Sequence, residues 1–351
     1  MQARPQRGFV LVIVLALLVV LALLAGIVAA SGRQAVTEAQ RTVDGFQSDV
    51  DMLSTRETVL FMLATQRKNL GGLVADATAP ITMAQLDDDA DGTLELPTGT
   101  EIRLDGTPYV GLGDARFALQ DDRGLLNLNW ASPLMRAAFY TARGVPSHEW
   151  DPLDAKRLDY QDPDSLHRLG GAEADHYRSA GLPPPANRTL ATPLEFRRIL
   201  QWRSMLEPLD DERLLGLLTL APGSSINLNT ASKDLLELIP GMTPEEAERM
   251  IALRRQAPFT TVSQVRATFP IAPFLEDGLT LFPNVSGNLI LWDRRFGIRR
   301  LAHWTLTALQ PGGPPWRIDY EVTLPRGKQS DEAVAGTPAT PLLATQDPAG
   351  Q

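Results

Sequence analysis

An uncharged apolar run from Phe9 to Ala30, FVLVIVLALLVVLALLAGIVAA, constrains the fold more than any other feature of the chain. A helix rises about 1.5 Å per residue, so this run crosses the hydrocarbon core of a bilayer once. Arg4 and Arg7 precede it and Arg33 is the first charge after it. The positive-inside tendency therefore predicts a cytoplasmic head and an exported body. A cleaved secretory signal is the alternative, but its apolar region is usually shorter.

The length and charge of the chain limit what the exported body can be. With 351 residues in total, the body should hold two globular parts. A formal charge of -9 argues against a general nucleic-acid binder, whose surface would be basic. Acidic loops can instead hold a cation. The absence of cysteine shows only that no disulfide staples the body.

Beyond the apolar run, the helical pattern continues to about Leu70. Apolar residues recur at helical spacing, which predicts an amphipathic spine that packs on a sheet. An ordinary stalk or a short coiled coil is the alternative. Gly71 and Gly72 should end the helix. The residues of this stripe are Val36, Ala39, Val43, Phe46, Val50, Leu53 and Leu60.

Short strand patterns lie on both sides of a long helical region. Residues 100–104 and 108–112 flank an Asp-Gly pair, which is typical of a hairpin, and residues 115–120 follow as a third strand. Between Trp130 and Pro283 the patterns are helical. Strands return from Asn288, and the alternation over 317–324 predicts an antiparallel strand with one wet face. We predict an α+β fold: a long spine helix on a small antiparallel sheet, with a large inserted all-helical domain.

The segment LDDDADGTLELP resembles the first half of a calcium loop. Asp87, Asp89 and Asp91 alternate before Gly92, so that their carboxylates converge and the glycine permits a sharp turn. The twelfth position of such a loop is normally a bidentate glutamate, and here it is Thr98. A solvated acidic turn is therefore the alternative.

The segment INLNTASKDLLELIPGMTPEEAERM predicts two short helices around a tight turn. Asn229 or Thr230 should cap the first helix, Pro240 and Gly241 should make the turn, and Thr243 should begin a capping box. The segment resembles a helix-hairpin-helix, including the NLNTA opening of competence proteins that bind DNA. Basic and acidic residues balance between residues 224 and 269, which favours a hairpin used for packing or protein contact over one that binds phosphate. Its candidate residues are Asn227, Asn229, Pro240 and Gly241.

The start of the apolar run, RGFVLVIVLALL, resembles the class III signal of type IV pilins and type II secretion pseudopilins. The resemblance implies that a prepilin peptidase cleaves between Gly8 and Phe9 and methylates Phe9. Most members carry a glutamate at the fifth mature position, where this chain has Ile13. The protein K family of minor pseudopilins lacks that glutamate, occupies the filament tip, and carries an NLNTA-type hairpin in an inserted helical domain.

A second acidic segment, DYQDPDSLHRLGGAEADHY, resembles the acidic segment of the protein K family. Members can bind calcium in this domain. The resemblance therefore implies a calcium site at Asp159, Asp162, Asp164 and Glu173, whose hard oxygens suit that ion. Helix caps and surface charge are the alternative reading. Calcium is the only cofactor that the sequence suggests.

The resemblance implies a domain organisation in which a leader precedes the membrane helix. The parts are a leader (1–8), a transmembrane helix (9–30), the spine with the first strands (31–128), the inserted helical domain (129–285), the closing strands (286–325) and a disordered tail (326–351).

The resemblance also implies a function in assembly. The chain would cap a pseudopilus from the bacterial inner membrane, with its N-terminus cytoplasmic and its body periplasmic. Expected partners are prepilin peptidase, minor pseudopilins of the I and J type, the major pseudopilin, secreted substrates and the secretin. A membrane-anchored DNA-uptake protein and a minor pilin of a type IV pilus are the alternatives. The four histidines form no zinc-type pair and no phosphate-binding glycine motif occurs, so we do not expect an enzyme.

Overall fold

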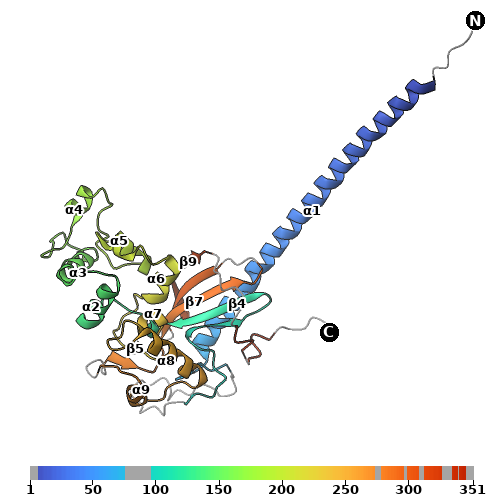
Figure 1. Cartoon of the computed structure of the whole chain (residues 1–351). Helices are drawn as coiled ribbons and strands as arrows, with labels where there is room; N and C mark the ends of the chain where they lie inside the picture. The colour runs from blue at the N-terminus through green and yellow to red at the C-terminus, as the bar shows by residue number, and fades with distance from the viewer. Residues whose placement is uncertain are drawn as a thin grey trace, which may run out of the picture. The chain divides into compact units, whose positions relative to one another are not determined.

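A computed structural model describes residues 7–75, 96–272, 278–295, 299–307, 312–325, 334–338 and 340–344. The chain divides into two units, Met1–Val50 and Asp51–Gln351. The helix α1 runs without a break from Arg7 to Thr65 (Figure 1). Its first part is long and apolar enough to cross a membrane.

The apolar side chains of α1 do not face where the sequence predicted. Val36, Val43 and Phe46 are 60–70% exposed, and Leu53 is 52% exposed. Of the expected stripe, Leu60 is fully buried. The residues that face the sheet lie on a different side of the helix, where Thr55 accepts the N–H of Leu112 at 2.9 Å and where a Cβ on Gly111 would lie 2.6 Å from the Thr55 side chain. These buried residues are Met52, Thr55, Val59, Leu60, Met62 and Leu63.

The second unit contains a five-stranded antiparallel sheet in the order β3-β4-β7-β8-β9. Side chains that alternate along the central strands meet α1 in one hydrophobic core, which includes Phe117, Leu119, Leu289 and Leu291. The strands are β3 (Asp105–Val110), β4 (Ala115–Asp121), β7 (Ser286–Asp293), β8 (Arg299–Leu306) and β9 (Trp316–Leu324). A separate short pair joins β1 (Lys68–Asn69) and β2 (Gly72–Leu73).

The predicted Asp-Gly hairpin is wrong. Asp105 and Gly106 lie inside β3, where the register with β4 shifts, and residues 100–104 form no strand. Asp105 is held instead by its side chain, which accepts hydrogen bonds from Arg103 and Thr107. The turn that leads into β4 is the next one, at residues 111–114.

A helical region with its own core lies between β4 and β7 (Figure 1). Trp202 stacks on Phe196 and contacts Tyr140 edge-on at its centre. The helices are α2 (Pro133–Ala142), α3 (Trp150–Asp159), α4 (Ala174–Ser179), α5 (Trp202–Leu206), α6 (Asp211–Leu217), α7 (Lys233–Leu236), α8 (Pro244–Gln256) and α9 (Val262–Thr268). The described residues of the region also form the 3-10 helices η2 (Asp122–Gly124), η3 (Ser147–Glu149) and η4 (Pro193–Arg198). A two-residue parallel pair joins β5 (Ile226–Asn227) to β6 (Leu279–Thr280).

The predicted α+β class is confirmed by this arrangement of a long helix, an antiparallel sheet and a helical insertion. The expectation of a disordered tail does not hold for the described residues after 333. Ala335 donates its N–H to Pro108 O of β3, and Leu343 is 1% exposed in the core under the sheet. Two main-chain hydrogen bonds to β3 and one buried leucine therefore hold these residues in place despite a composition rich in Pro, Thr and Ala.

Candidate functional site

The first unit carries an apolar helical surface. Each described Leu, Ile and Val side chain between Leu11 and Val28 is at least 48% exposed. A helix that is apolar on all sides suits lipid or other apolar helices better than water. Gly8 and Phe9 lie in the first turn of α1, and cleavage between them stays a prediction. Ile13 is 50% exposed on this surface, so an apolar side chain stands where the sequence resemblance would place a glutamate.

The acidic segment after α3 brings its carboxylates together around one arginine. The Arg168 guanidinium contacts both Asp159 and Asp162, and the Asp159 carboxylate also accepts the N–H of Ala172 at 2.9 Å. A Cβ at Gly171 would lie 1.9 Å from the Asp159 carboxylate, so glycine is required for this close approach. The segment is therefore a built loop in which Arg168 balances two carboxylates.

Two carboxylate oxygens in this cluster have no hydrogen-bond partner. They are Oδ1 of Asp162 and Oε1 of Glu173, and Glu173 is only 7% exposed. Burial raises the pKa of Glu173, and the carboxylates of Asp159, Asp162 and Asp164 raise it further. The four predicted residues thus lie within electrostatic reach of one another. No group of three or more His, Asp or Glu among the described residues is arranged to hold a metal ion, so calcium binding stays a proposal.

The other calcium candidates, Asp87, Asp89 and Asp91, lie outside the described residues. What can be described is the end of that segment. Glu101 accepts hydrogen bonds from Asn69, Gly99 and Thr98. Its oxygens therefore organise the turn before β3.

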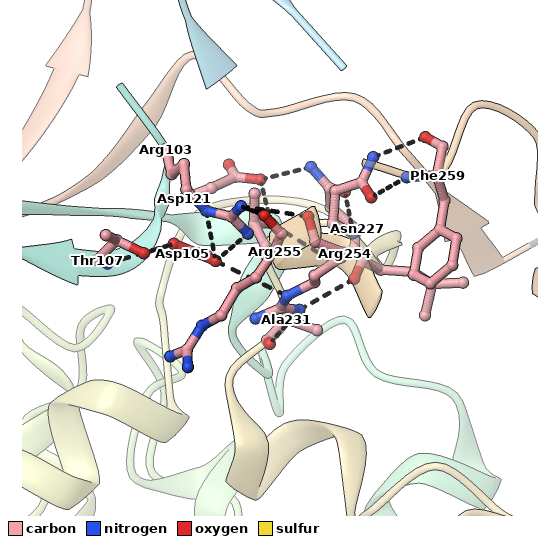
Figure 2. Close-up of polar contacts among 12 residues, drawn as sticks. Arg103, Asp105, Thr107, Asp121, Asn227, Ala231, Arg254, Arg255 and Phe259 are labelled. Atoms are coloured by element: carbon pink, nitrogen blue, oxygen red, sulfur yellow. Dashed lines mark hydrogen bonds and ion pairs between the residues drawn. The ribbon is translucent and has the colours of Figure 1, made fainter. Parts of the chain in front are cut away.

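The asparagines of the NLNTA segment fasten the hairpin half to the rest of the body. Asn229 donates to Leu70 O at 3.1 Å and to Phe259 O at 3.0 Å, and it accepts the N–H of Phe259 at 2.9 Å. Asn227 donates to the Asp121 carboxylate at the end of β4 at 3.1 Å (Figure 2). Both amides are buried, so their partners are protein groups. The segment therefore acts as an internal fastening.

Arg254 also holds the hairpin half in place, and its side chain is not free to bind a phosphate. Its side chain is 3% exposed and donates to Leu228 O at 3.0 Å and to Ala231 O at 2.8 Å (Figure 2). It also lies 3.8 Å from the Asp105 carboxylate. Burial lowers the pKa of Arg254 to about 10, and the charge of Asp105 opposes that shift. Its neighbour Arg255 is exposed.

The turn of the hairpin uses its own backbone donors. The N–H of Met242 bonds Ile239 O at 3.0 Å, and the N–H of Thr243 bonds the Glu246 carboxylate at 2.9 Å in the predicted capping box. Gly241 has φ 98°, and a Cβ there would lie 2.2 Å from Pro270 O. These amides are therefore unavailable as the phosphate cradle of a DNA-binding hairpin.

The first helix of the hairpin is capped later than predicted. Ser232, and not Asn229 or Thr230, accepts the N–H of Leu235 and caps α7. The asparagines are instead used in the turn that precedes the cap. The N–H of Asn229 bonds the side chain of Asn227 at 2.9 Å, and the N–H of Ala231 bonds Asn227 O at 2.7 Å.

The structure reveals a second copy of this turn that the sequence analysis missed. Residues 126–132, LNLNWAS, repeat the pattern of 226–232, INLNTAS. The N–H of Asn129 bonds Asn127 at 2.9 Å, the N–H of Ala131 bonds Asn127 O at 2.8 Å, and Ser132 caps α2. The repeated Asn-Leu-Asn-x-Ala-Ser spacing was the available signal. Each half of the helical insertion therefore opens on the same turn.

Two consecutive buried aspartates tie the helical insertion to the sheet. Asp121 accepts from Asn227, Thr230 and the N–H of Asn284, and burial raises its pKa to about 6. Its neighbour Asp122 accepts from Thr219 at 2.7 Å, Ser286 at 2.5 Å and His303 Nε2 at 2.9 Å. The chain leaves the sheet beside these residues and returns beside them, so they fix the insertion at its root.

His303 adds a positive charge to the cluster formed by Asp121 and Asp122. It also donates from Nδ1 to Asp319 at 2.9 Å and stacks on Tyr320. Burial opposes the charged form, but the hydrogen bonds to Asp122 and Asp319 prevail and raise the pKa of His303 to about 9. The imidazolium is thus a buried tie between η2, β8 and β9.

Comparisons with known proteins found a family and a solved structure that resemble this chain. A protein family described as "Helix-hairpin-helix motif" matches residues 222–269. Among solved structures, the chain resembles one from "The Crystal Structure of the GspK-GspI-GspJ complex from enterotoxigenic Escherichia coli Type 2 Secretion System". The two are 15% identical, the match covers 84% of this chain and 99% of that chain, and the TM-score is 0.47. No curated protein matches the chain significantly.

Proposed function

We propose that this chain is a minor pseudopilin of a type II secretion system, similar to the protein K family, and that it acts in assembly. The observation that carries the proposal is the architecture of one continuous helix. The first part of α1 is apolar on all sides, and residues 52–63 contribute to the core beneath an antiparallel sheet. A helical insertion between β4 and β7 is the second feature that the resemblance requires.

Two features of the chain support a position at the tip of the filament. Ile13 cannot neutralise the N-terminal amine of a neighbouring subunit inside the membrane, where an isolated charge is costly. The helical insertion is a bulky domain with its own core, rooted at Asp121 and Asp122. We infer that it blocks the addition of another subunit above it, while the apolar helix joins a bundle of like helices.

Partners and location belong to the same proposal. The apolar part of α1 would anchor the chain in the inner membrane, with residues 1–8 cytoplasmic and the body periplasmic. Minor pseudopilins of the I and J type would bind beside it. The major pseudopilin, secreted substrates and the secretin would contact the assembled tip.

Calcium binding at the acidic segment is a further part of the proposal. Asp159, Asp162, Asp164 and Glu173 would supply the oxygens, and Arg168, which is 44% exposed, would leave Asp162 for solvent. The unpartnered oxygens of Asp162 and Glu173 support this assignment. The ion would neutralise the buried carboxylates and hold the loop on α4.

DNA binding by the hairpin is not favoured by the structure. The buried Arg254 and the self-bonded turn amides leave few groups for a phosphate. Salt-sensitive binding of duplex DNA that weakens in an Arg255→Ala variant would support that alternative class.

Mass spectrometry of the N-terminus tests the class of the protein. We expect the chain purified from membranes to begin at Phe9 and to carry one N-terminal methyl group, because the Gly8-Phe9 signal is that of a prepilin peptidase substrate. A chain that retains Met1 in the membrane would contradict the proposal. Co-expression with an inactive peptidase is the control and should leave the leader in place.

A further inference from the structure

The strand β3 lies at one edge of the sheet and presents half of its backbone groups outward. Tyr109 pairs with Phe117, and the N–H of Gly111 bonds Ala115 O at 2.9 Å, so these residues face β4. Groups on alternate residues point to opposite sides of a strand. The carbonyl of Pro108 and the N–H of Val110 therefore point away from the sheet. Such an edge is a template for an added strand.

The C-terminal segment of the chain occupies this edge. The N–H of Ala335 bonds Pro108 O at 2.9 Å, and the N–H of Val110 bonds Gly336 O at 3.0 Å. Gly336 has φ 90°, a conformation that favours glycine. Both outward groups of the edge thus have partners from one stretch of chain.

A side chain secures the segment a few residues later. Leu343 is 1% exposed and belongs to the core between α1 and the sheet, whereas the adjacent Leu342 is 39% exposed. A turn in which the N–H of Leu343 reaches Thr340 O directs it inward. The contact therefore combines main-chain hydrogen bonds with one apolar pocket.

We propose that the outer edge of β3 is a peptide-binding site and that residues 334–338 and 340–344 are its built-in ligand. The main-chain bonds at Pro108 and Val110 provide affinity, and the pocket for Leu343 provides specificity, as in other cases of strand addition. Occupation by this segment closes the edge to strands of other chains. The inference goes beyond the proposed function and does not depend on it.

Hydrogen exchange at two neighbouring amides tests the proposal in the full-length chain in detergent micelles. In Leu343→Asp, the segment should detach, and exchange at Val110 should rise about 10- to 100-fold because a buried leucine is worth that factor. Exchange at Gly111 should not change, since its partner is Ala115 O within the sheet. The matched control, Leu342→Asp, should leave both amides as they are. Equal acceleration at both amides, or none at Val110, would overturn the proposal.

A second measurement separates a binding site from a general loss of stability. A chain that ends at residue 333 should show the same selective exposure of Val110. Adding a synthetic peptide of residues 334–344 should restore its protection, and the same peptide with Leu343→Asp should not. If the wild-type peptide has no effect, the edge is not a peptide-binding site and the proposal fails.

Discussion

At the scale of single residues, buried amides and charges hold the helical insertion in place. Asn229 is 6% exposed and satisfies three main-chain groups on two distant segments, at Leu70 and Phe259. A buried polar group is costly when its partner is removed. These side chains are therefore more important for the position of the hairpin half than its surface charges are.

Replacing Asn229 tests this fastening. Asn229→Ala should lower the free energy of unfolding by about 2–4 kcal/mol, because it leaves buried main-chain groups of Leu70 and Phe259 unpaired. Chemical denaturation measures the change. The comparison is Asn129→Ala at the equivalent position of the first turn, which is exposed and whose side chain bonds Gln161 and Arg157, and for which we expect a smaller cost. Equal costs at the two positions would contradict the role of Asn229.

His303 makes a second residue-scale prediction, in its pH dependence. Its pKa is raised from 6.5 to about 9, so its stabilising contribution is complete below pH 6.5 and is lost as the pH rises through 9. Between pH 6.5 and 8 the loss is on the order of 1.5 kcal/mol. Burial lowers the pKa of Lys68 to about 8, so the stability change with pH that Lys68 contributes has the opposite sign and lies mainly above this range.

Comparison with a His303→Gln variant isolates the effect. The stability of the variant, measured by denaturation at several pH values, should lack this decline between pH 6.5 and 8. The hydrogen bonds of Asp319 with His303, Thr305 and Arg317 outweigh the effect of burial and lower its pKa to about 2. Asp319 would therefore change the stability only below pH 4. If both proteins show the same slope, the decline belongs to other groups.

At the scale of elements, the acidic loop between α3 and α4 is the part whose behaviour should depend on solution conditions. Asp159 is buried and held by main-chain donors, whereas Glu173 keeps an unpartnered oxygen. The first carboxylate has a structural role without any ion. The second stands at the N-cap of α4, and its Oε1 is free to bind a cation or a proton.

Calcium removal tests this element. Calcium at a hundredfold excess over its Kd should add about 2.7 kcal/mol to the stability of the helical insertion, and a chelator should remove it. Thermal unfolding with calcium or chelator measures the difference. The pair of substitutions Asp164→Asn and Glu173→Gln should abolish the response, while Asp175→Asn, at an exposed residue paired with Arg178, should retain it. An identical midpoint under both conditions would exclude a stabilising site.

Sequence patterns predicted the elements better than their contacts. The apolar run, the capping box at Thr243 and the strand beginning at Ala115 are local features, and the structure has them. The prediction of which face of α1 is buried was wrong. The stripe that is exposed in the structure is as regular as the buried one, and only contacts with the sheet distinguish the two. The burial of Arg254 depends on Asp105, which is distant in sequence, so charge counting missed it.

At the scale of the whole molecule, the predicted class followed from the order of patterns along the chain. The order helix, strands, helices, strands implies a helical insertion into a sheet, because the two separated groups of strands must pair in space. The cluster of Asp121, Asp122 and His303 could not be predicted from the sequence, because its members come from three separate elements, β4, η2 and β8. The ordered C-terminal residues were missed for a similar reason. Their order depends on the burial of Leu343 in a core formed by distant residues, which the local sequence does not indicate.

Purification of the full-length chain from cells that also express the other pilin-like proteins of the same system tests the central claim most directly. The account predicts a stoichiometric complex, extracted from the membrane in mild detergent, that contains this chain and two other minor pseudopilins. Its composition can be read by native mass spectrometry, with an unrelated single-pass membrane protein as control. A chain that emerges alone and retains duplex DNA would contradict the assignment to a pseudopilus tip.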